Sequence, residues 1–479
     1  MATPADSPLA RPEQIQGNIL RPFGGGHQAF LALSFANDQA GARRWLAGVT
    51  ARVTGTIDVP PRAPRGETRL VPGHTLLNVG LTAPGLVVLH PETAGRLAAY
   101  EAFWAGPLGP RLDEANRLTT TPALLGDTGG SDPLHWVVGG VGPSVDALLT
   151  IAAGDEQTIA DAVRRELADA TGAGLKELYT QFGVVHRDEA DGHRIEHFGF
   201  ADGISQPAVQ GFPDPGAHFG SPVIAAGEFI LGCPGERRPP TWKQRPVPAR
   251  WMQGGSFQVF RRLVQDVPGW WNRMAELAAP GQTPQEAAAR ALGRRLDGKP
   301  LARPDAKPGE ENDFTFADDP DGEKTPFYAH IRKMNPRDDE VFRDRGRKML
   351  RRGLPFGPVY DSEHPDNEPR GIAFNSYLSS IEDQYEFIQR SWAQAPGFPT
   401  SSLVAYGRSA AEEPPRIDGL DPVLGDKHED AARRLPAAVV NKIPKPAYGG
   451  FVTTTGAVYA FAPSLPALHR LAGSESLDS

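Results

Sequence analysis

The sequence predicts an α+β protein with two halves of similar make-up. A chain of 479 residues exceeds the usual size of one hydrophobic core, so we expect two domains or one unusually large domain. Strand-like apolar runs alternate with segments of helical periodicity in both halves. This alternation suits a repeated β-α-β-β-α-β plan in which two sheets face one another. We expect an N-terminal domain over residues 14–225 and a C-terminal domain over residues 226–472.

The first half contains strand and helix patterns in alternation. Strands are predicted at residues 29–35, 75–81, 134–139 and 179–186. Helices are predicted at residues 40–49, 84–89 and 144–170.

The second half repeats this alternation around a long irregular segment. Strands are predicted at residues 228–233, 256–263 and 371–378, and a hairpin at 450–461. Helices are predicted at residues 270–277, 284–296 and 381–392. The stretch from 299 to 325 is rich in Pro, Asp and Glu and lacks periodicity, so a surface loop is expected there.

Composition excludes several classes of protein. With 39% hydrophobic and 23% charged residues, the chain is typical of a globular protein. Its net charge of −8 argues against a nucleic-acid partner, and no apolar run is long enough to cross a membrane. Residues 1–11 lack the basic and apolar regions of a secretory signal, and the single cysteine, Cys233, excludes an internal disulfide. A cytoplasmic location is therefore expected.

Two segments far apart in the sequence carry residues suited to redox chemistry. One reads His-Phe-Gly-Phe-Ala-Asp-Gly-Ile-Ser-Gln-Pro over residues 197–207. The other reads Ala-His-Ile-Arg-Lys-Met-Asn-Pro-Arg over residues 329–337, and Leu-Arg-Arg-Gly follows at 350–353. Together they offer a carboxylate, a histidine beside cationic residues and an arginine next to a glycine.

Asp202, His330 and Arg351 are the residue types that a haem peroxidase needs. Peroxide chemistry at iron requires one strong axial ligand, and a neutral imidazole supplies it while leaving the opposite face open. On that face a carboxylate can move a proton between the peroxide oxygens, and a guanidinium can stabilise negative charge. Taken singly, these residues have ordinary explanations, because Asp-Gly is a common turn and Arg-Arg-Gly a common strand end.

The same segments resemble the dye-decolorizing peroxidase family. That family has a Gly-Phe-x-Asp-Gly-Ile motif, a His-x-Arg-Lys-x-Asn-Pro-Arg motif and an Arg-Arg-Gly motif, and all three occur here in the family's order. The resemblance extends from about residue 14 to about residue 472. It includes further similar segments at residues 16–20, 255–263, 380–389, 449–456 and 459–464.

The resemblance implies a fold and a set of catalytic residues. The expected fold is a pair of duplicated ferredoxin-like domains forming a two-sheet β sandwich with peripheral helices, similar to a dimeric α+β barrel. By its place in the motif, His330 would ligate the iron of one haem b per chain. Asp202 would transfer the peroxide proton, and Arg351 would stabilise the developing charge and the oxoferryl intermediate.

Further cofactor contacts follow from the same resemblance. Asp421 is the preferred partner for the second ring nitrogen of His330, with a carboxylate of residues 382–386 as the alternative. Arg332 is a candidate partner for a haem propionate. Asn335 would order the distal or propionate network. Ile204 and Phe374 would contact the haem.

The expected partners are hydrogen peroxide and an organic reducing substrate such as a dye or phenol. We expect a monomer or a small homo-oligomer. In the family, bulky donors can react at surface Trp or Tyr residues, but the sequence does not reveal the donor. One departure concerns Ala373, which stands where the family often has a bulky aliphatic residue. It would enlarge the haem pocket if it faced that pocket.

Three other interpretations are less favoured. His193 to His197 spell H-x-x-E-H, a zinc peptidase pattern, but the flanking glycines leave little room for a helix. Cys233 could supply a thiolate haem ligand, although a lone cysteine is usually a small buried hydrophobe. A protein for haem handling or storage, or a specialised biosynthetic haem oxidase, is the third. Simple haem binding would require neither Asp202 nor Arg351.

Overall fold

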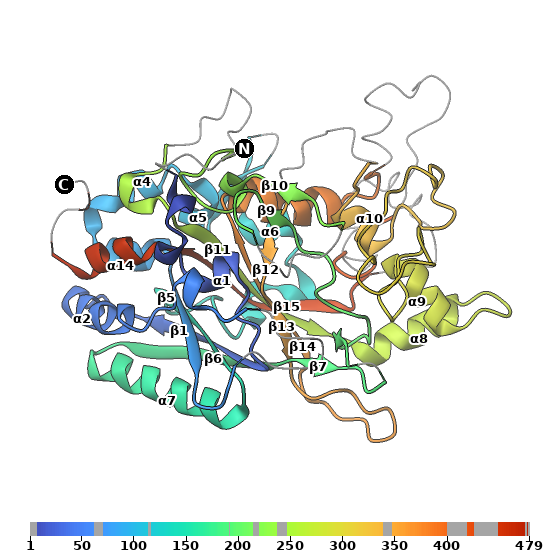
Figure 1. Ribbon diagram of the computed structural model, residues 1–479, viewed down its shortest axis with the longest axis horizontal. Helices are drawn as coiled ribbons and strands as arrows, with labels where there is room; N and C mark the ends of the chain where they lie inside the picture. The colour runs from blue at the N-terminus through green and yellow to red at the C-terminus, as the bar shows by residue number, and fades with distance from the viewer. Residues whose placement is uncertain are drawn as a thin grey trace.

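The computed structural model describes residues 7–61, 70–113, 116–190, 192–213, 220–236, 247–338, 347–399, 419–425, 449–474 and 477. Within these residues, nine strands form one curved sheet (Figure 1). Its strand order is β12-β14-β11-β15-β2-β5-β1-β6, and β13 pairs with β14 beside β12. None of the described helices is long and apolar enough to cross a membrane.

The first half of the chain builds one end of this sheet with a β-α-β-β-α-β connection. Its elements are β1 (His27–Ser34), α2 (Gln39–Thr50), β2 (Thr75–Leu81), β5 (Ala147–Ala153), α7 (Glu156–Gly172) and β6 (Lys176–Val184). Asp38 and Asp155 cap the two helices by accepting hydrogen bonds from the backbone N–H groups of Gly41 and Thr158. The spatial order β2-β5-β1-β6 is that of a ferredoxin-like unit.

The second half repeats the same connection. Its elements are β11 (Ser256–Gln265), α8 (Val267–Leu277), β12 (Leu350–Arg351), β13 (Leu354–Phe356), β14 (Gly371–Leu378), the π-helical segments η9 (Ile381–Glu386) and η10 (Ile388–Ala393), and β15 (Val452–Ala462). Its spatial order is β12-β14-β11-β15, which is the second, third, first and fourth strand of this half. The first half has the same order, so the predicted duplicated plan is confirmed.

The two half-sheets are joined at one edge and also pack face to face. A single residue pair, Phe461 with Leu81, links β15 to β2. On the inner faces, the rings of Phe30 and Phe260 lie 4.9 Å apart, although β1 and β11 are not neighbours in the sheet. The outer face of β1 packs Leu31 and Leu33 against α2 and α7. The halves meet through a shared core, and their division at residue 225 stays a prediction.

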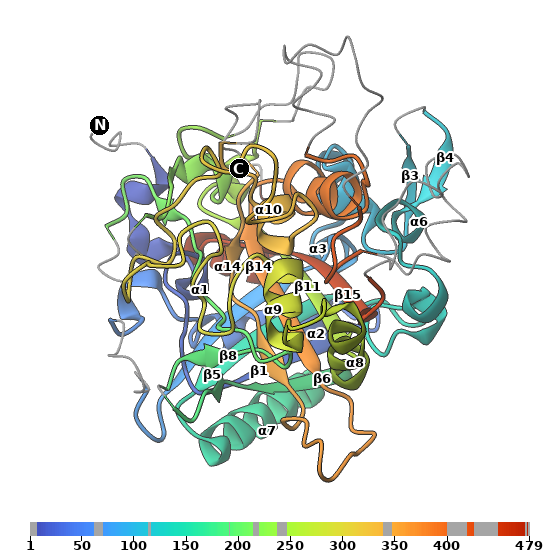
Figure 2. The ribbon, with the colours of Figure 1, turned by 90° about the vertical axis from the view of Figure 1, so that its right-hand side faces the viewer.

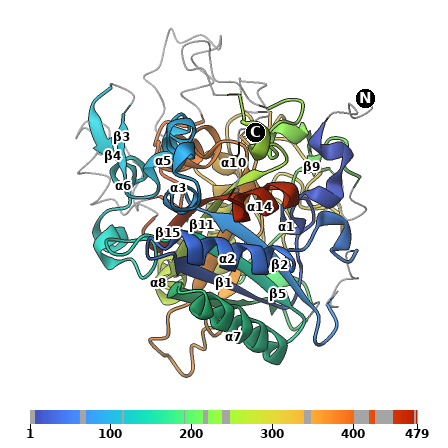
Figure 3. The same ribbon diagram turned by 90° about the vertical axis from the view of Figure 1, so that its left-hand side faces the viewer.

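Helices cover the outer faces of the two halves on opposite sides of the molecule. Figure 3 shows α2, α7 and α14 (Leu465–Ala472) on one side. Figure 2 shows α8, α9 (Pro284–Leu292) and α10 (His330–Met334) on the other. The remaining helices are α1 (Gly17–Leu20), α3 (Ala83–Leu89), α4 (Ala94–Leu97), α5 (Glu101–Ala105) and α6 (Thr121–Leu125). Short strand pairs are β3 (Pro110–Leu112) with β4 (Leu118–Thr120), β7 (His186–Arg187) with β8 (Arg194–Ile195), and β9 (Ala208–Val209) with β10 (Val223–Ile224).

Four predicted elements were wrong. Residues 144–170 contain strand β5 before α7, because the buried apolar run at 147–153 gives no periodicity that distinguishes strand from helix. Residues 134–139 form a 3-10 turn (Pro133–His135) and one bridge between Val138 and Gly456. Residues 228–233 begin at the end of a 3-10 turn (Ala226–Glu228) and continue as turns, and their apolar run Phe229 to Leu231 is buried without forming a strand. Residues 450–461 form one strand, β15, and no hairpin.

Candidate active site

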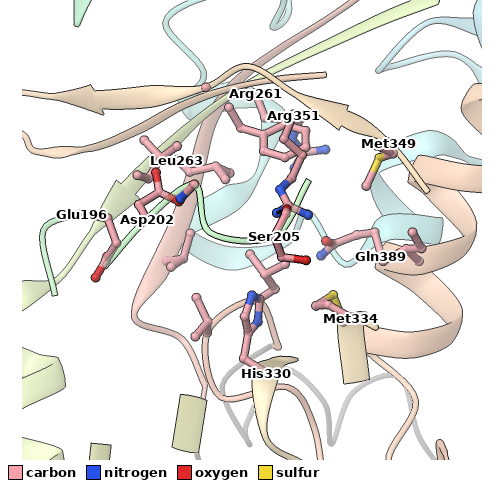
Figure 4. A pocket seen from close by; sticks show the side chains of 18 of the residues that line it. Glu196, Asp202, Ser205, Arg261, Leu263, His330, Met334, Met349, Arg351 and Gln389 are labelled. Carbon is pink, nitrogen blue, oxygen red and sulfur yellow. Dashed lines mark hydrogen bonds between the residues drawn. The ribbon is translucent and has the colours of Figure 1, made fainter. Parts of the chain in front are cut away.

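A cavity of about 540 Å³ lies against the C-terminal half of the sheet. Strands β11, β12, β14 and β15 contribute to its lining, together with the loop 201–207, α10 and the π-helical segments (Figure 4). Its volume falls within the range of roughly 300–1,000 Å³ typical of small-molecule and cofactor sites. All three residues that the motifs indicate, Asp202, His330 and Arg351, line it.

His330 begins α10 and points into the cavity from below in Figure 4. Its Nδ1 lies 3.0 and 3.1 Å from the two carboxylate oxygens of Asp421. Asp421 is fully buried and also accepts 2.8 Å hydrogen bonds from the backbone N–H groups of Val423 and Leu424. Burial tends to raise the pKa of Asp421, but His330 and these N–H groups outweigh it, so the pKa lies below its ordinary value. An ionised Asp421 fixes the Nδ1–H tautomer and leaves Nε2 for a metal.

Asp202 and Arg351 lie on the opposite side of the cavity from His330 (Figure 4). Backbone hydrogen bonds hold the loop 201–207, which carries Asp202. One of them runs from the N–H of Asp202 to the carbonyl of Arg194 over 2.9 Å. Strand β12 carries Arg351, whose guanidinium donates to the carbonyl of Ser205. The surface of Arg351 is exposed to the cavity, and protein atoms nevertheless surround the side chain. This enclosure lowers the pKa of Arg351, and the Asp202 carboxylate opposes the shift.

Three of the other predicted cofactor contacts also line the cavity. Ile204 and Phe374 give it apolar walls, and Asn335 accepts a hydrogen bond from the Lys348 ammonium over 2.5 Å. Ala373, in contrast, is fully buried in the core between the two half-sheets. Successive residues of a strand point to opposite faces, so Ala373 does not enlarge the cavity.

Arg332 is not among the residues that line the cavity, contrary to the expectation of a propionate contact. It is fully buried and pairs with the Asp319 carboxylate at 3.0 Å. It also donates to the carbonyl of Thr325 over 2.7 Å, and its guanidinium lies over the rings of Phe316 and Phe327. Because α10 turns by about 100° per residue, Arg332 faces away from the side that His330 presents. We infer that it anchors the preceding loop.

Two other arginines, Arg294 and Arg337, line the cavity and were not predicted. Arg337 donates to the carbonyls of Asn312 and Phe314, and its backbone adopts an unusual φ of 54°. Burial lowers the pKa of Arg294 to about 9, assisted by the charge of Arg337, and burial lowers the pKa of Arg337 to about 10. Both guanidinium groups are removed from water and repel one another, so an anionic ligand would stabilise their charged forms. The motif contains Arg337, whereas no local sequence pattern indicated Arg294.

Glu196 and His197, part of the H-x-x-E-H pattern, fix the loop that carries Asp202. The Glu196 carboxylate accepts 3.0 Å bonds from the backbone N–H groups of Phe198 and Phe200 and a 2.7 Å bond from Gln265. Nε2 of His197 donates to the carbonyl of Phe356 on β13 over 2.8 Å. Burial raises the pKa of Glu196 to about 7, with Asp202 adding to the shift, and burial lowers the pKa of His197 to about 4.

Comparison with known proteins decides the family. A model of the C-terminal part of Dyp-type peroxidases matches residues 242–410. The dye-decolorizing peroxidase msp1 of Mycetinis scorodonius is 31% identical over 396 residues, which cover 75% of this chain and 71% of that protein. The chain belongs to the dye-decolorizing peroxidase family. Members of this family are haem peroxidases, so the chain is a haem-dependent oxidoreductase that uses hydrogen peroxide.

Solved structures of the family share this fold. A dye-decolorizing peroxidase from Auricularia auricula-judae superposes with a TM-score of 0.75 at 24% identity, covering 96% of this chain and 99% of that one. Another solved dye-decolorizing peroxidase, a complex with 2,6-dimethoxyphenol, superposes with a TM-score of 0.74 at 24% identity and the same coverage.

The residues around the cavity fit a haem. A haem requires a strong nitrogen ligand, apolar walls and cations for its two carboxylates. His330 offers the nitrogen, Ile204 and Phe374 the walls, and Arg294 and Arg337 the cations. His330 and Arg337 share one motif, whereas Ile204, Arg294 and Phe374 come from other parts of the chain and meet them only in the folded protein.

The zinc and thiolate alternatives gain no support from the geometry. In the parts of the chain that the structure describes, no group of three His, Cys, Asp or Glu side chains is placed to hold a metal ion. His197 is engaged with β13, as described above. Cys233 is buried in an apolar cluster near Ser7 and is not among the residues that line the cavity.

Proposed function

We propose that this dye-decolorizing peroxidase binds haem b through His330 and uses Asp202 and Arg351 to activate hydrogen peroxide. The observation that carries the proposal is their arrangement in one cavity. A histidine with a buried carboxylate partner stands on one side, and a carboxylate and a guanidinium stand on the other.

Bound haem would supply the iron at which the peroxide O–O bond breaks. Asp202 would accept a proton from one peroxide oxygen and return it to the other as it departs, directly or through a water. Arg351 would stabilise the negative charge that develops as the bond breaks. The hydrogen bond from His330 to Asp421 would strengthen the imidazole as a ligand.

Arg294 and Arg337 would pair with the haem carboxylates. Burial lowers the pKa of both guanidinium groups, so an anionic partner would stabilise their charged forms. Asn335 and Lys348 lie nearby in the lining and would add hydrogen bonds.

The organic donors would be dyes, phenols or other compounds that give up one electron at a time. The complex of a related dye-decolorizing peroxidase with 2,6-dimethoxyphenol supports a phenol as the first substrate to test. A cytoplasmic location and a monomeric or small homo-oligomeric state complete the proposal. Cell fractionation and gel filtration would test these two points.

The decisive experiment compares four proteins loaded with haem. These are the wild type, His330→Ala, Asp202→Asn and Arg351→Leu. We expect His330→Ala to lose haem, and the other two variants to keep haem but react with peroxide about 10²–10⁴ times more slowly. An unchanged spectrum in His330→Ala would refute the ligand assignment. A wild type that binds haem but never reacts with peroxide would favour haem handling or storage.

A further inference from the structure

Two of the five methionines of the chain, Met334 and Met349, line the candidate haem cavity. Met334 ends α10, one helical turn after His330, and Met349 stands two residues before Arg351. Figure 4 shows both on the side of the cavity where Gln389 lies. One thioether therefore lies close in the chain to His330 and the other close to Arg351, and both line the cavity.

We propose that the enzyme oxidises its own Met334 and Met349 to methionine sulfoxide during peroxide turnover, and that this oxidation limits the number of turnovers. The inference rests on the proposed function, because haem and peroxide are the oxidising system. The net reaction converts one thioether and one hydrogen peroxide into one sulfoxide and one water. A lone pair of Sδ forms an S–O bond with one peroxide oxygen, the O–O bond breaks, and the second oxygen leaves with both protons as water.

Accessibility separates these two methionines from two others in the core. Met334 and Met349 are half-buried at the cavity, whereas Met252 and Met274 are 0% exposed. Met252 and Met274 thus serve as internal controls. They carry the same chemical group in the same protein but have no route for peroxide.

Oxidation at either position would disturb the cavity. The Met349 sulfur accepts a hydrogen bond from the Ser376 hydroxyl over 3.9 Å, and Ser376 is paired with Arg351 between β14 and β12. Met334 and Met349 also pack against an apolar cluster formed by Ile388, Trp392 and Phe398. A sulfoxide turns an apolar, flexible side chain into a polar one, so it would loosen this wall and shift the strand that holds Arg351.

The experiment treats the haem-loaded enzyme with hydrogen peroxide in the absence of an organic donor and maps its peptides by mass spectrometry. We expect the peptides containing Met334 and Met349 to gain one oxygen atom roughly tenfold faster than those containing Met252 and Met274. In haem-free protein at the same peroxide concentration, Met334 and Met349 should be oxidised at least about tenfold more slowly than in the haem-loaded enzyme. Methionine sulfoxide reductases should remove the added oxygen and restore lost activity.

Variants test the functional consequence. The double variant Met334→Leu/Met349→Leu nearly conserves side-chain volume and should complete at least about twice as many turnovers per haem before inactivation. Met274→Leu should inactivate like the wild type. An enzyme that oxidises a phenol while Met334 and Met349 stay unmodified would overturn this inference and leave the proposed function intact. Equal oxidation at all four methionines would overturn it too, and a protein that binds no haem would overturn both proposals.

Discussion

Nδ1 of His330 lies 3.0 Å from the carboxylate of Asp421, although the two residues are 91 positions apart in the chain. Asp421 is fully buried and is oriented by backbone N–H groups two and three residues further on. This arrangement presents an ionised acceptor to the imidazole and fixes its tautomer. In the proposed haem complex, the strength of His330 as a ligand would therefore depend on the buried carboxylate of Asp421.

The first prediction concerns that loop. Asp421→Asn removes the negative charge but keeps the side-chain shape, so we expect haem to dissociate about 10–100-fold faster. Transfer of haem to an excess of apomyoglobin measures this rate. Asp319→Asn is the matched control, because Asp319 is also a buried carboxylate but pairs with Arg332 outside the cavity. Equal haem loss in the two variants would mean that Asp421 acts only through the fold.

The second prediction separates two neighbouring arginines. Arg351 reaches into the cavity, whereas Arg352 is buried and donates 2.8 Å bonds to the carbonyls of Asn18 and Ile19. Arg351→Leu should slow the reaction with peroxide about 10²–10³-fold at nearly unchanged stability. Arg352→Leu should instead lower the free energy of unfolding by about 1–3 kcal/mol, because buried carbonyls lose their donors. Stopped-flow spectroscopy and urea denaturation measure the two effects, and an exchange of the two results would contradict the assignment.

The third prediction concerns pH and the loop that carries Asp202. Burial lowers the pKa of His197 from 6.5 to about 4, so its stabilising contribution is complete above pH 6.5 and is lost as the pH falls toward 4. Burial raises the pKa of Glu196 from 4.5 to about 7, so its contribution is complete below pH 4.5 and is lost as the pH rises toward 7. Between pH 4.5 and 6.5 the two effects oppose one another.

Neutral substitutions should therefore change the pH dependence in opposite directions. In Glu196→Gln, stability should rise more steeply with pH than in the wild type, and in His197→Gln it should rise less steeply or fall. Each change in slope should reach up to about 1 kcal/mol per pH unit. Urea denaturation at several pH values from 4.5 to 6.5 measures the slopes. Changes of the same sign in both variants would refute this account.

The fourth prediction concerns Gly298, which lies against the Asp202 loop. Its φ is +87°, and a Cβ atom there would lie 2.2 Å from Cδ1 of Ile204 and 3.1 Å from Cβ of Ala201. Gly298→Ala should cost about 1–3 kcal/mol of stability from overpacking and should slow the reaction with peroxide by moving the loop. Gly309→Ala is the control, since Gly309 has a similar φ of +93° and nothing within 4 Å of the added Cβ. If both variants reacted with peroxide alike, the contact with Ile204 would have no role.

Several features of the fold were predictable because they depend on local sequence. The strands β1, β2, β11 and β14 and the helices α2, α3, α8 and α9 were predicted within a few residues of their bounds, apart from an overlong end of α9. Strand β5 was missed for a physical reason. It is buried on both faces, so its residues are uniformly apolar and lack a period.

The candidate site was predictable mainly where a motif marks it, and Asp421 and Phe374 were the predicted residues outside the motifs. Asp202, His330 and Arg351 stand in short motifs, and the structure brings them to one cavity as expected. Arg332 stands in the same motif as His330 but turns away to Asp319. Its direction depends on the helical rotation of α10 and on a loop whose position the local sequence does not specify.

By itself, the sequence determined the duplicated plan and the chemical types at three positions, because periodicity and motifs are local properties of a chain. For the partner of His330, the sequence left two candidates, and the tertiary structure places Asp421 against the imidazole. Only the tertiary structure decided that Arg294 joins Arg337 and that Glu196 and His197 hold the Asp202 loop. Each of these arrangements includes a contact between segments far apart in the chain, such as His330 with Asp421 or His197 with Phe356. Contacts of that kind arise from packing around a shared core, which no short stretch of sequence encodes.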